Sequence, residues 1–430
     1  MGAEGAQGLA GDTSMKQVKL GDAAKFIRGI TFKPDDKVKP FSDGSIVCFR
    51  TSNVQSILNE QDLIAVPSKF VKRHEQFAQA GDILVSTANS WELVGKCSWV
   101  PDLKYRATIG GFISALRADP ETVLPRYLYH WFNSPEIQLI ARNCGRQTTN
   151  ISNMDIKRCQ GIIIPLPPLE QQRRIAAILD KADELRAKRR RAIAKLDELL
   201  KSVFLEMFGD PVTNPKSWAQ VRLGEVTEEA TYGTSIKCSS EPSDSSLPIL
   251  RIPNVTQEKV NWGDLKYAEL TEQEQKKLML NSGDILFVRS NGNPHYIGRC
   301  AVFSDIKAAA FASYLIRVRL KKDSRLLPNF IQSVLSFPSY RPTLVREAQT
   351  TAGNYNINTQ RLKSLQIIAP SRTEQRTYVD FANNLEAQAR LQGQTLSQLD
   401  NLFSSLQVRA FSGDLTPDVL DEVEAVAAGS

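Results

Sequence analysis

Residues 167–191 read PPLEQQRRIAAILDKADELRAKRRR, a stretch that opens with two prolines and then runs without a helix breaker. Pro168 suits the first position of a helix, where no N–H donor is needed. Apolar residues follow at three- and four-residue steps, which predicts one long amphipathic helix. They are Ile175, Ile178, Leu179, Ala182, Leu185, Ile193, Leu196, Leu199, Val203 and Met207. Gly209 and Pro211 predict the end of this helix.

A diverged copy of the same pattern, a proline followed by Glu-Gln and a long helix, appears as PSRTEQRTYVDFANNLEAQARL at residues 370–391. Ser371 and Glu374 have the spacing of a capping box, and Gly413 followed by Pro417 predicts the stop. Each helix would have about 40 residues and a length of about 60 Å. A helix with such an apolar seam needs a partner, and the simplest partner is the other copy, packed parallel or antiparallel. The polar middle of the second helix, QARLQGQTLSQ with Gly393, predicts an uneven seam.

The whole chain is a tandem duplication. Seven blocks recur in the same order, at offsets that stay between 201 and 206 residues. The pairs are QVKLGD (17–22) with QVRLGE (220–225), TSNV (51–54) with IPNV (252–255), AGDILVS (80–86) with SGDILFV (282–288), GKC (95–97) with GRC (298–300), LPRYLYHWFNSP (124–135) with LPNFIQSVLSFP (327–338), RQTTNIS (146–152) with a stretch inside 348–358, and LDELLKSVFLEMFGD (196–210) with LDNLFSSLQVRAFSGD (399–414). Chance does not preserve such a register.

Each half begins with a globular head in which short β-type runs are bounded by Gly, Pro, Asn and Asp. A helical segment near the end of each head follows, which predicts α/β (α+β) heads in tandem, each followed by a long helix. The predicted divisions are a leader (1–14), the first head (15–165), the first long helix (166–210), the second head (211–369), the second long helix (370–414) and an acidic, mobile tail (415–430).

The composition of 42% apolar and 23% charged residues is that of a globular protein, and no apolar run is long enough to span a membrane. The net charge of +7 permits a polyanionic partner without requiring one. Six cysteines contain no CxxC pair and only three histidines are present. Zinc sites and disulfides are therefore not expected, and a reducing cytoplasm is the simplest location.

Signatures of catalysis are weak. Residues 293–296, Asn-Pro-His-Tyr, resemble the Asn-Pro-Pro-Tyr of adenine methyltransferases, but the second proline is absent. The strings 101–104 (PDLK) and 264–266 (DLK) can be forced into a nuclease pattern of two carboxylates and a lysine, yet no carboxylate cluster accompanies them. No GxxxxGK[ST] phosphate loop occurs. We therefore expect a non-catalytic chain that has no catalytic residues and no metal site.

A globular domain that ends in a proline-rich segment and a long helix, repeated once, resembles the specificity subunit of type I restriction–modification enzymes. The resemblance covers essentially residues 15–415. Its most specific pieces are IIIPLPPLEQQRRIAAILDKAD and LDELLKSVFLEMFGDP, supported by GDIL and QTTNIS. In the second copy PPLEQ has become PSRTEQ, a departure from the family pattern.

The resemblance implies two target-recognition domains, each reading one half of a split, asymmetric double-stranded DNA target. It also implies that the helices form an antiparallel coiled-coil spacer that sets the gap between half-sites and docks two methyltransferase subunits, through which restriction subunits join. The resemblance places no cofactor in this chain. S-adenosylmethionine, ATP and Mg²⁺ would belong to the partner subunits.

The candidate DNA-binding residues lie in polar loops, where Asn and Gln can pair with adenine and Arg with guanine. In the first head they are Arg50, Asn53, Ser86, Thr87, Asn89, Trp91, Arg146, Gln147, Thr148, Thr149 and Asn150. In the second head they are Arg251, Asn254, Arg289, Ser290, Asn291, Asn293, His295, Tyr296, Gln349, Thr350, Thr351, Asn354, Tyr355 and Asn356.

Ordinary turn chemistry is the alternative for each of these residues. Asn53 and Asn254 recur at equivalent places, which favours a shared structural role, whereas loops that differ between the heads are better candidates for reading bases. The basic run 186–195 would be a solvated helix face, a phosphate contact or a site for an acidic partner. Three alternative functions remain: an enzyme with a degenerate site, a protein-binding scaffold with duplicated heads, and the specificity part of a related methyltransferase or nuclease system.

Overall fold

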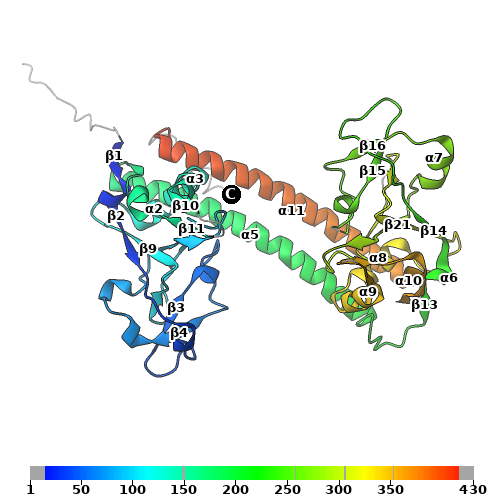
Figure 1. The fold of residues 1–430 in the computed structure, drawn as a ribbon, viewed down its shortest axis with the longest axis horizontal. Helices are drawn as coiled ribbons and strands as arrows, with labels where there is room; N and C mark the ends of the chain where they lie inside the picture. The colour runs from blue at the N-terminus through cyan, green and yellow to red at the C-terminus, as the bar shows by residue number, and fades with distance from the viewer. Residues whose placement is uncertain (1–14, 148–150, 257, 305–306, 352, 416–430) are drawn as a thin grey trace, which may run out of the picture. The chain divides into compact units, whose positions relative to one another are not determined.

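The computed structural model describes residues 15–147, 151–256, 258–304, 307–351 and 353–415, with the backbone alone at residues 146, 147 and 351. The predicted leader and the predicted tail beyond residue 415 lie outside this range. Contacts group the chain into two units, residues 1–190 with 394–430 and residues 191–393. Each unit contains one head and one end of each long helix (Figure 1).

The first unit contains twelve strands and four short helices among its described residues. The strands are β1 (Lys16–Lys19), β2 (Ala24–Arg28), β3 (Ser45–Phe49), β4 (Ile64–Pro67), β5 (Ile83–Ser86), β6 (Ala88–Asn89), β7 (Cys97–Trp99), β8 (Ala107–Ile109), β9 (Ile113–Ala118), β10 (Gly145–Gln147), β11 (Ser152–Met154) and β12 (Ile163–Leu166). The short helices are α1 (Leu20–Ala23), α2 (Pro125–Phe132), α3 (Pro135–Asn143) and α4 (Ile156–Gln160).

The second unit repeats this inventory and adds one helix, α7, in its middle. The strands are β13 (Gln220–Arg222), β14 (Thr227–Tyr232), β15 (Leu247–Leu250), β16 (Lys266–Ala268), β17 (Ile285–Val288), β18 (Ser290–Asn291), β19 (Cys300–Val302), β20 (Ala310–Phe311), β21 (Leu315–Leu320), β22 (Gln349–Thr351), β23 (Asn354–Asn356) and β24 (Gln366–Ile368). The helices are α6 (Leu223–Val226), α7 (Glu272–Leu278), α8 (Pro328–Ser336), α9 (Arg341–Glu347) and α10 (Thr359–Ser364).

The two heads have the same sheets in the same strand order, which confirms the duplication. The first head has a four-stranded sheet β2-β9-β5-β7, a three-stranded sheet β4-β3-β8, a two-stranded sheet β1-β12 and a small sheet β10-β11-β6. The second head has β14-β21-β17-β19, β16-β15-β20, β13-β24 and β22-β23-β18. Among the strands that the structure describes, only β3–β8 and β15–β20 pair in parallel. The predicted α/β (α+β) class with tandem heads is therefore confirmed.

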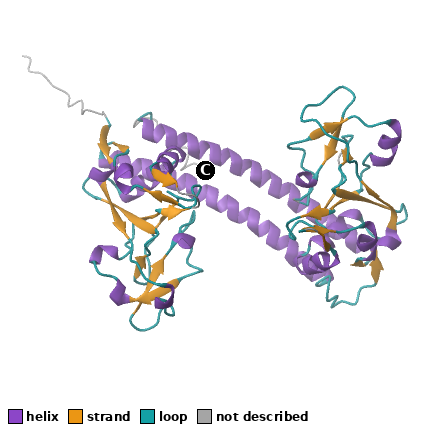
Figure 2. Ribbon diagram, viewed as in Figure 1, coloured by secondary structure: helices purple, strands orange, loops and turns teal. Residues whose placement is uncertain are grey.

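One of the two central strands of each four-stranded sheet, β5 or β17, is apolar apart from Ser86 because both of its faces are covered. In β5, Ile83 and Val85 pack with the helices, whereas Leu84 faces the three-stranded sheet. In β17, Ile285 and Phe287 likewise face the helices. Successive strand residues point to opposite faces, so burial on both sides requires an unbroken apolar run. The strands β3 and β4 in the first head, and β15 and β16 in the second, lie on the side of the four-stranded sheet away from α2 and α8, respectively (Figure 1 and Figure 2).

The repeated GDIL motif turns the chain into this central strand. Gly81 and Gly283 both have φ of +92°, a conformation that favours glycine. Asp82 is buried and accepts hydrogen bonds from Nε and Nη2 of Arg117, both at 2.7 Å. Asp284 and Arg319 form the same pair in the second head, at 2.8 and 2.7 Å. A buried carboxylate in each head is thus matched by a bidentate guanidinium.

The two long helices are α5 (Leu169–Phe208) and α11 (Arg372–Ser412). Helix α5 begins one residue after Pro168, so the expectation that Pro168 occupies the first helical position is wrong by one residue. The capping box at Ser371 is confirmed: its Oγ accepts from Glu374 N at 3.3 Å, and the Glu374 carboxylate accepts from Ser371 N at 2.9 Å. Gly209 (φ +75°) and Gly413 (φ +94°) follow the last helical residues, as predicted. Helix α11 continues through Gly393.

A buried glutamine amide fastens the start of each long helix to its head. Gln172 Oε1 accepts from Leu124 N at 2.9 Å, and its Nε2 donates to Pro167 O at 2.9 Å. Gln375 repeats both contacts with Leu327 N and Pro370 O, also at 2.9 Å. These residues are 1% and 0% exposed. The equivalent glutamine is thus the last letter of PPLEQQ and of PSRTEQ.

Within the first unit, the two helix ends pack antiparallel. Gln171 near the start of α5 donates to Leu415 O at 3.1 Å, and Arg186 further along α5 pairs with Asp400 at 2.6 Å. Arg190 reaches the same carboxylate at 2.9 Å, and the Arg186 guanidinium lies 4.1 Å from the ring centre of Phe403. In the basic run 186–195, Arg186 and Arg190 therefore stabilise the helix pair.

Within the second unit, the helix ends also run antiparallel, since the end of α5 packs on the start of α11. Phe204 and Phe208, absent from the predicted seam, are buried against Tyr378 at ring distances of 5.3 and 5.6 Å. Leu199, which the predicted seam includes, is 44% exposed in this unit, and Leu185, a seam residue of the first unit, is 38% exposed. The buried face is set by the head as well as by the partner helix, because α8 also packs on Phe204.

A polar cluster around the buried His130 lies between α2 and the long helices of the first unit. His130, 1% exposed, contacts Asp180 through Nε2 at 2.7 Å, and Arg126 Nε donates to the same oxygen at 2.5 Å. Gln407 of α11 donates to His130 O at 3.2 Å. Burial lowers the pKa of His130, although Asp180 opposes this shift.

None of the described helices combines the length and apolar content that a membrane crossing requires. All six cysteines are free thiols, and five of them are buried. Burial raises the pKa of Cys97 to about 12, so this thiol is protonated at neutral pH.

Replacement of Gln172 by alanine is expected to lower the free energy of unfolding by about 3 kcal/mol, because it leaves a buried N–H and a buried C=O without partners. Urea unfolding followed by circular dichroism measures the change. Arg173→Ala, one residue further along the same helix, is the matched control, since its exposed pair with Glu170 contributes little. Equal losses in the two variants would contradict the docking role of Gln172.

Acidification is expected to weaken the first unit through His130. The pKa of its imidazole is lowered in the folded chain, so this group contributes its full stability above about pH 6.5 and loses it as the pH falls below that value. Charged groups facing the ring are Asp180, Arg126 and Asp183. Urea midpoints at pH 7.5 and pH 5.5 test this. The drop should shrink in His130→Gln, and an undiminished drop would contradict the assignment.

Candidate nucleic-acid interface

Two polar segments that lie about 60 residues apart in the first head meet in one small sheet. Strand β6, within the candidate loop 86–91, pairs with β11, and β11 pairs with β10, which overlaps the start of the candidate loop 146–150. The register places Asn89 opposite Ser152 and Gln147 opposite Ser152 on its other side. The predicted loops are therefore parts of a single surface.

The second head assembles the equivalent sheet from the equivalent segments. Strand β18, within the loop 289–296, pairs with β23, which pairs with β22, within the loop 349–356. Ser290 lies opposite Asn356, and Asn291 lies opposite Tyr355. The structure thus brings together both loop groups predicted in this head.

The same backbone contacts hold both small sheets in place. In the first head Thr87 N donates to Phe112 O at 3.0 Å, and Met154 N donates to Thr87 O at 2.9 Å. In the second head Arg289 N donates to Tyr314 O at 2.9 Å, and Ile357 N donates to Arg289 O at 2.9 Å. Phe112 and Tyr314 were not among the predicted residues, although their spacing of 202 residues lies within the repeat.

The side chains on this shared backbone differ between the heads. Thr87 of the first head corresponds to Arg289 of the second, whose guanidinium lies 4.6 Å from the ring centre of Tyr232 and donates to Ser313 O at 3.1 Å. Ala88 corresponds to Ser290. Identical frames with different hydrogen-bonding groups can recognise different base sequences.

The predicted residues of the small sheets and their flanking loops are mostly exposed or half-buried. Trp91, Asn293, His295, Tyr296, Gln349, Thr350 and Asn354 are exposed. Thr87, Asn89, Arg289, Ser290, Asn291, Tyr355 and Asn356 are half-buried. Arg146, Gln147 and Thr351 are described by their backbone alone, and Thr148, Thr149 and Asn150 lie outside the described residues. Contact with DNA stays a prediction for this set.

Asn53 and Asn254 must be removed from the candidate set. They are 0% and 1% exposed, and each amide is fully used inside its own turn. Asn53 Oδ1 accepts from Arg50 N at 2.8 Å, while Nδ2 donates to Asn59 O at 2.8 Å and Asp62 O at 3.1 Å. Asn254 repeats this pattern in the second head. Their shared role is to close a turn, as their equivalence indicated.

Three further candidates are engaged within the chain. Arg50 pairs with Asp62 at 2.6 Å and Arg251 with Asp264 at 2.9 Å, next to these turns. Ser86 is 1% exposed, and its Oγ accepts from Asn89 Nδ2 at 3.2 Å. Burial removes the Ser86 side chain from the candidate set. The two arginines are half-buried and hold the turns to the following segment.

Two successive side-chain turns span residues 291–295 and include the start of the Asn-Pro-His-Tyr segment. Asn291 Oδ1 accepts from Asn293 N at 2.8 Å, and Asn293 Oδ1 accepts from His295 N at 2.9 Å. This is the local chemistry that makes asparagine frequent in turns. Elsewhere in the described residues, no group of three or more His, Cys, Asp or Glu side chains is arranged to hold a metal ion.

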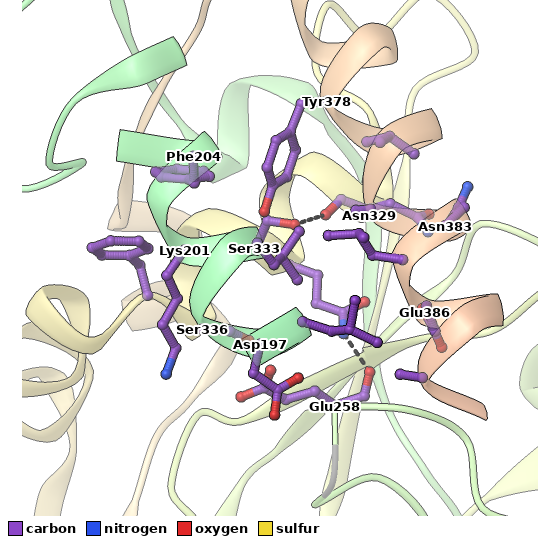
Figure 3. A pocket seen from close by; sticks show the side chains of 18 of the residues that line it. Asp197, Lys201, Phe204, Glu258, Asn329, Ser333, Ser336, Tyr378, Asn383 and Glu386 are labelled. Atoms are coloured by element: carbon purple, nitrogen blue, oxygen red, sulfur yellow. Dashed lines mark hydrogen bonds between the residues drawn. The ribbon is translucent and has the colours of Figure 1, made fainter. Parts of the chain in front are cut away.

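A cavity of about 520 Å³ lies in the second unit between α5, α8 and α11 (Figure 3). Asn329, Ser333 and Asn383 line it, as do Glu258 and Lys259. Gln332 Nε2 donates to Glu258 O, and Lys259 pairs with Glu386 at 2.7 Å. Burial raises the pKa of the Glu258 carboxyl.

The cavity exists because smaller side chains stand where the first unit has a filled cluster. By the repeat offset of 203 residues, Asn329 corresponds to Arg126 and Ser333 to His130. Ala389 corresponds to Arg186, which stacks on Phe403 in the first unit. The cavity thus follows from divergence of the two copies. The helices that line it, α5, α8 and α11, are not part of the small sheet.

Comparison with known proteins identifies the same two-fold repeat. The family model described as "Type I restriction modification DNA specificity domain" matches residues 13–196 and again residues 215–401. The chain is 26% identical to the type I restriction enzyme EcoKI specificity subunit of Escherichia coli (strain K12), over 94% of this chain and 91% of that protein. It is 24% identical to the StySPI specificity subunit of Salmonella potsdam, with the same coverage.

Two solved structures have a similar fold. The type I restriction–modification S subunit from M. genitalium matches with a TM-score of 0.53 at 14% identity, covering 94% of this chain and 98% of that one. A chain from a study of complex assembly and conformational transition in a type I restriction–modification system matches with a TM-score of 0.50 at 20% identity, covering 94% and 98%.

Replacement of Asn254 by alanine is expected to lower the free energy of unfolding by about 2–3 kcal/mol, because buried carbonyl and N–H groups lose their partners. Asn291→Ala, in the half-buried small sheet, should change it by about 1 kcal/mol or less. Thermal or urea unfolding separates the two variants. A larger loss in Asn291→Ala would mean that the amides have been assigned the wrong roles.

Proposed function

The chain belongs to the type I restriction modification DNA specificity family, and we propose on this premise that it is the sequence-specificity subunit of a type I restriction–modification complex. Each head reads one half of an asymmetric, bipartite DNA target. The observation that carries this proposal is the small sheet built twice on one backbone plan with different side chains. Similar but non-identical readers suit a target whose halves differ.

The small sheets suit contact with a DNA groove. Narrow antiparallel ribbons can enter the major groove, where amide, hydroxyl and guanidinium groups distinguish base pairs. In the second head, Asn291, Asn293 and Asn354 combine such chemistry with partial or full exposure. In the first head, Thr87, Asn89 and Trp91 occupy the corresponding ribbon and its flank.

The long helices are the proposed docking surface for two methyltransferase subunits, through which restriction subunits join. Apolar side chains remain exposed on the helix ends in each unit. Leu402 and Val408 are 53% and 66% exposed in the first unit, and Leu199 and Leu205 are both 44% exposed in the second. Exposed apolar groups of this kind are frequent where a partner binds. The antiparallel helices would then set the spacing between the half-sites.

Catalysis is assigned to the partners. The methyltransferase subunits would bind S-adenosylmethionine and flip out the target adenine, and ATP and Mg²⁺ would serve the restriction subunits. This chain supplies recognition and positioning. The lack of a GxxxxGK[ST] sequence supports a chain that does not hydrolyse ATP by that route. The six cysteines, all of them free thiols, support a reducing cytoplasm as the location.

Co-expression of the chain with its methyltransferase in a host that lacks DNA modification, followed by genome-wide mapping of methyladenine, tests the proposal. The expected result is a split motif with a fixed gap. Asn291→Ala should relax base preference in one half of that motif, and Asn89→Ala in the other half. An assembled, active complex that methylates adenine without a split motif would overturn the proposal and favour a protein-binding scaffold.

A further inference from the structure

An exposed aromatic side chain occupies the same position in both heads. Phe112 is 67% exposed and Tyr314 is 60% exposed, and they lie 202 residues apart within the repeat. Phe112 immediately precedes β9 in the first head, and Tyr314 immediately precedes β21 in the second. Single exposed apolar residues are common on proteins. Recurrence at one position in two diverged heads is not explained by that general tendency.

The backbone carbonyl of each aromatic residue accepts hydrogen bonds from the small sheet that is predicted to contact DNA. Phe112 O accepts from Thr87 N at 3.0 Å and from Ala88 N at 3.1 Å. Tyr314 O accepts from Arg289 N at 2.9 Å. The aromatic ring therefore starts from a point beside the first residues of β6 or β18, the strands whose side chains differ between heads.

The turn that carries each ring is held in one conformation. Ile113 N donates to Gly110 O at 3.0 Å, and Leu315 N donates to Ala312 O at 2.9 Å. Gly29 and Gly233 let a neighbouring strand end approach this turn closely. A Cβ on Gly29 would lie 2.2 Å from Gly110 O, and a Cβ on Gly233 would lie 2.2 Å from Phe311 O. A rigid mount lowers the entropy lost when the ring binds a ligand.

We propose that Phe112 and Tyr314 are base-contacting residues, each packing its ring against DNA bases in the half-site read by its own head. This inference rests on the proposed function. Aromatic rings contact bases by stacking, by packing on the thymine methyl group or by inserting at a base step. Neither ring carries a charge, so the contact adds recognition of bases without adding a phosphate anchor.

The test uses the full chain assembled with its methyltransferase partner, and a duplex that carries the split motif mapped for the wild-type complex. Phe112→Ala and Tyr314→Ala should each weaken binding to this duplex by about tenfold. The slope of affinity against salt should stay unchanged, because that slope counts phosphate contacts. Each variant should lose discrimination at its own half-site and keep it at the other.

Two further variants give the comparison its control. Tyr314→Phe keeps the ring and should bind the duplex with wild-type affinity. Phe41→Ala removes a ring that is also 67% exposed but lies against Tyr105, which packs on the core of the three-stranded sheet, and should leave affinity unchanged. Thermal unfolding should be alike for all variants, since the altered side chains are exposed.

The outcomes separate the inference from the function on which it rests. Specific binding by the wild type, with both alanine variants within twofold of it, would overturn the inference and leave the proposed function standing. A smaller salt slope with equal losses on target and unrelated DNA would assign the rings to backbone contacts and also overturn it. A wild-type complex without sequence preference would overturn both.

Discussion

A buried glutamine amide joins each long helix to the head that precedes it, and the arrangement of each unit depends on this contact. Gln172 and Gln375 each accept from one backbone N–H and donate to backbone carbonyls. An amide is the uncharged side chain that offers an acceptor and two donors on one planar group. A leucine of similar size would leave those backbone groups unpaired in the core. The direction in which the helix leaves the head is therefore tied to α2 or α8.

Once the helix start is fixed, the rest of each unit packs against it. In the first unit, Phe403, Leu406 and Ala410 of α11 join the core formed by α2 and the four-stranded sheet. In the second unit, Phe204 and Phe208 of α5 do so. Residues that differ between the units change how tightly the region between α2 or α8 and the long helices is packed. They leave a polar cluster at His130 in one unit and a cavity at Ser333 in the other.

In the small sheets, by contrast, the backbone arrangement is the same in both heads and the side chains differ. The small sheet of each head is held by main-chain hydrogen bonds at Thr87 or Arg289, which any residue except proline could make. Side chains at those positions are free to change without loss of the frame. Such separation of frame from readout lets one fold serve two different half-sites, since function resides in the site and not in the fold.

The sequence alone determined the duplication, both long helices, the capping box of the second helix and the ends of both. The helix signals are local: a capping box at Ser371, glycines at Gly209 and Gly413, and a helical period. It also located the polar loops. Only the tertiary structure decided which of their asparagines are available, because Asn53 is buried by a chain segment that returns at Asn59 and Asp62, whereas Asn293 is exposed. It also decided that Phe204 is buried and Leu199 exposed, since the buried face of a helix depends on what packs against it. Strand pairing between distant segments brought the loops together, and a local pattern contains no record of that pairing.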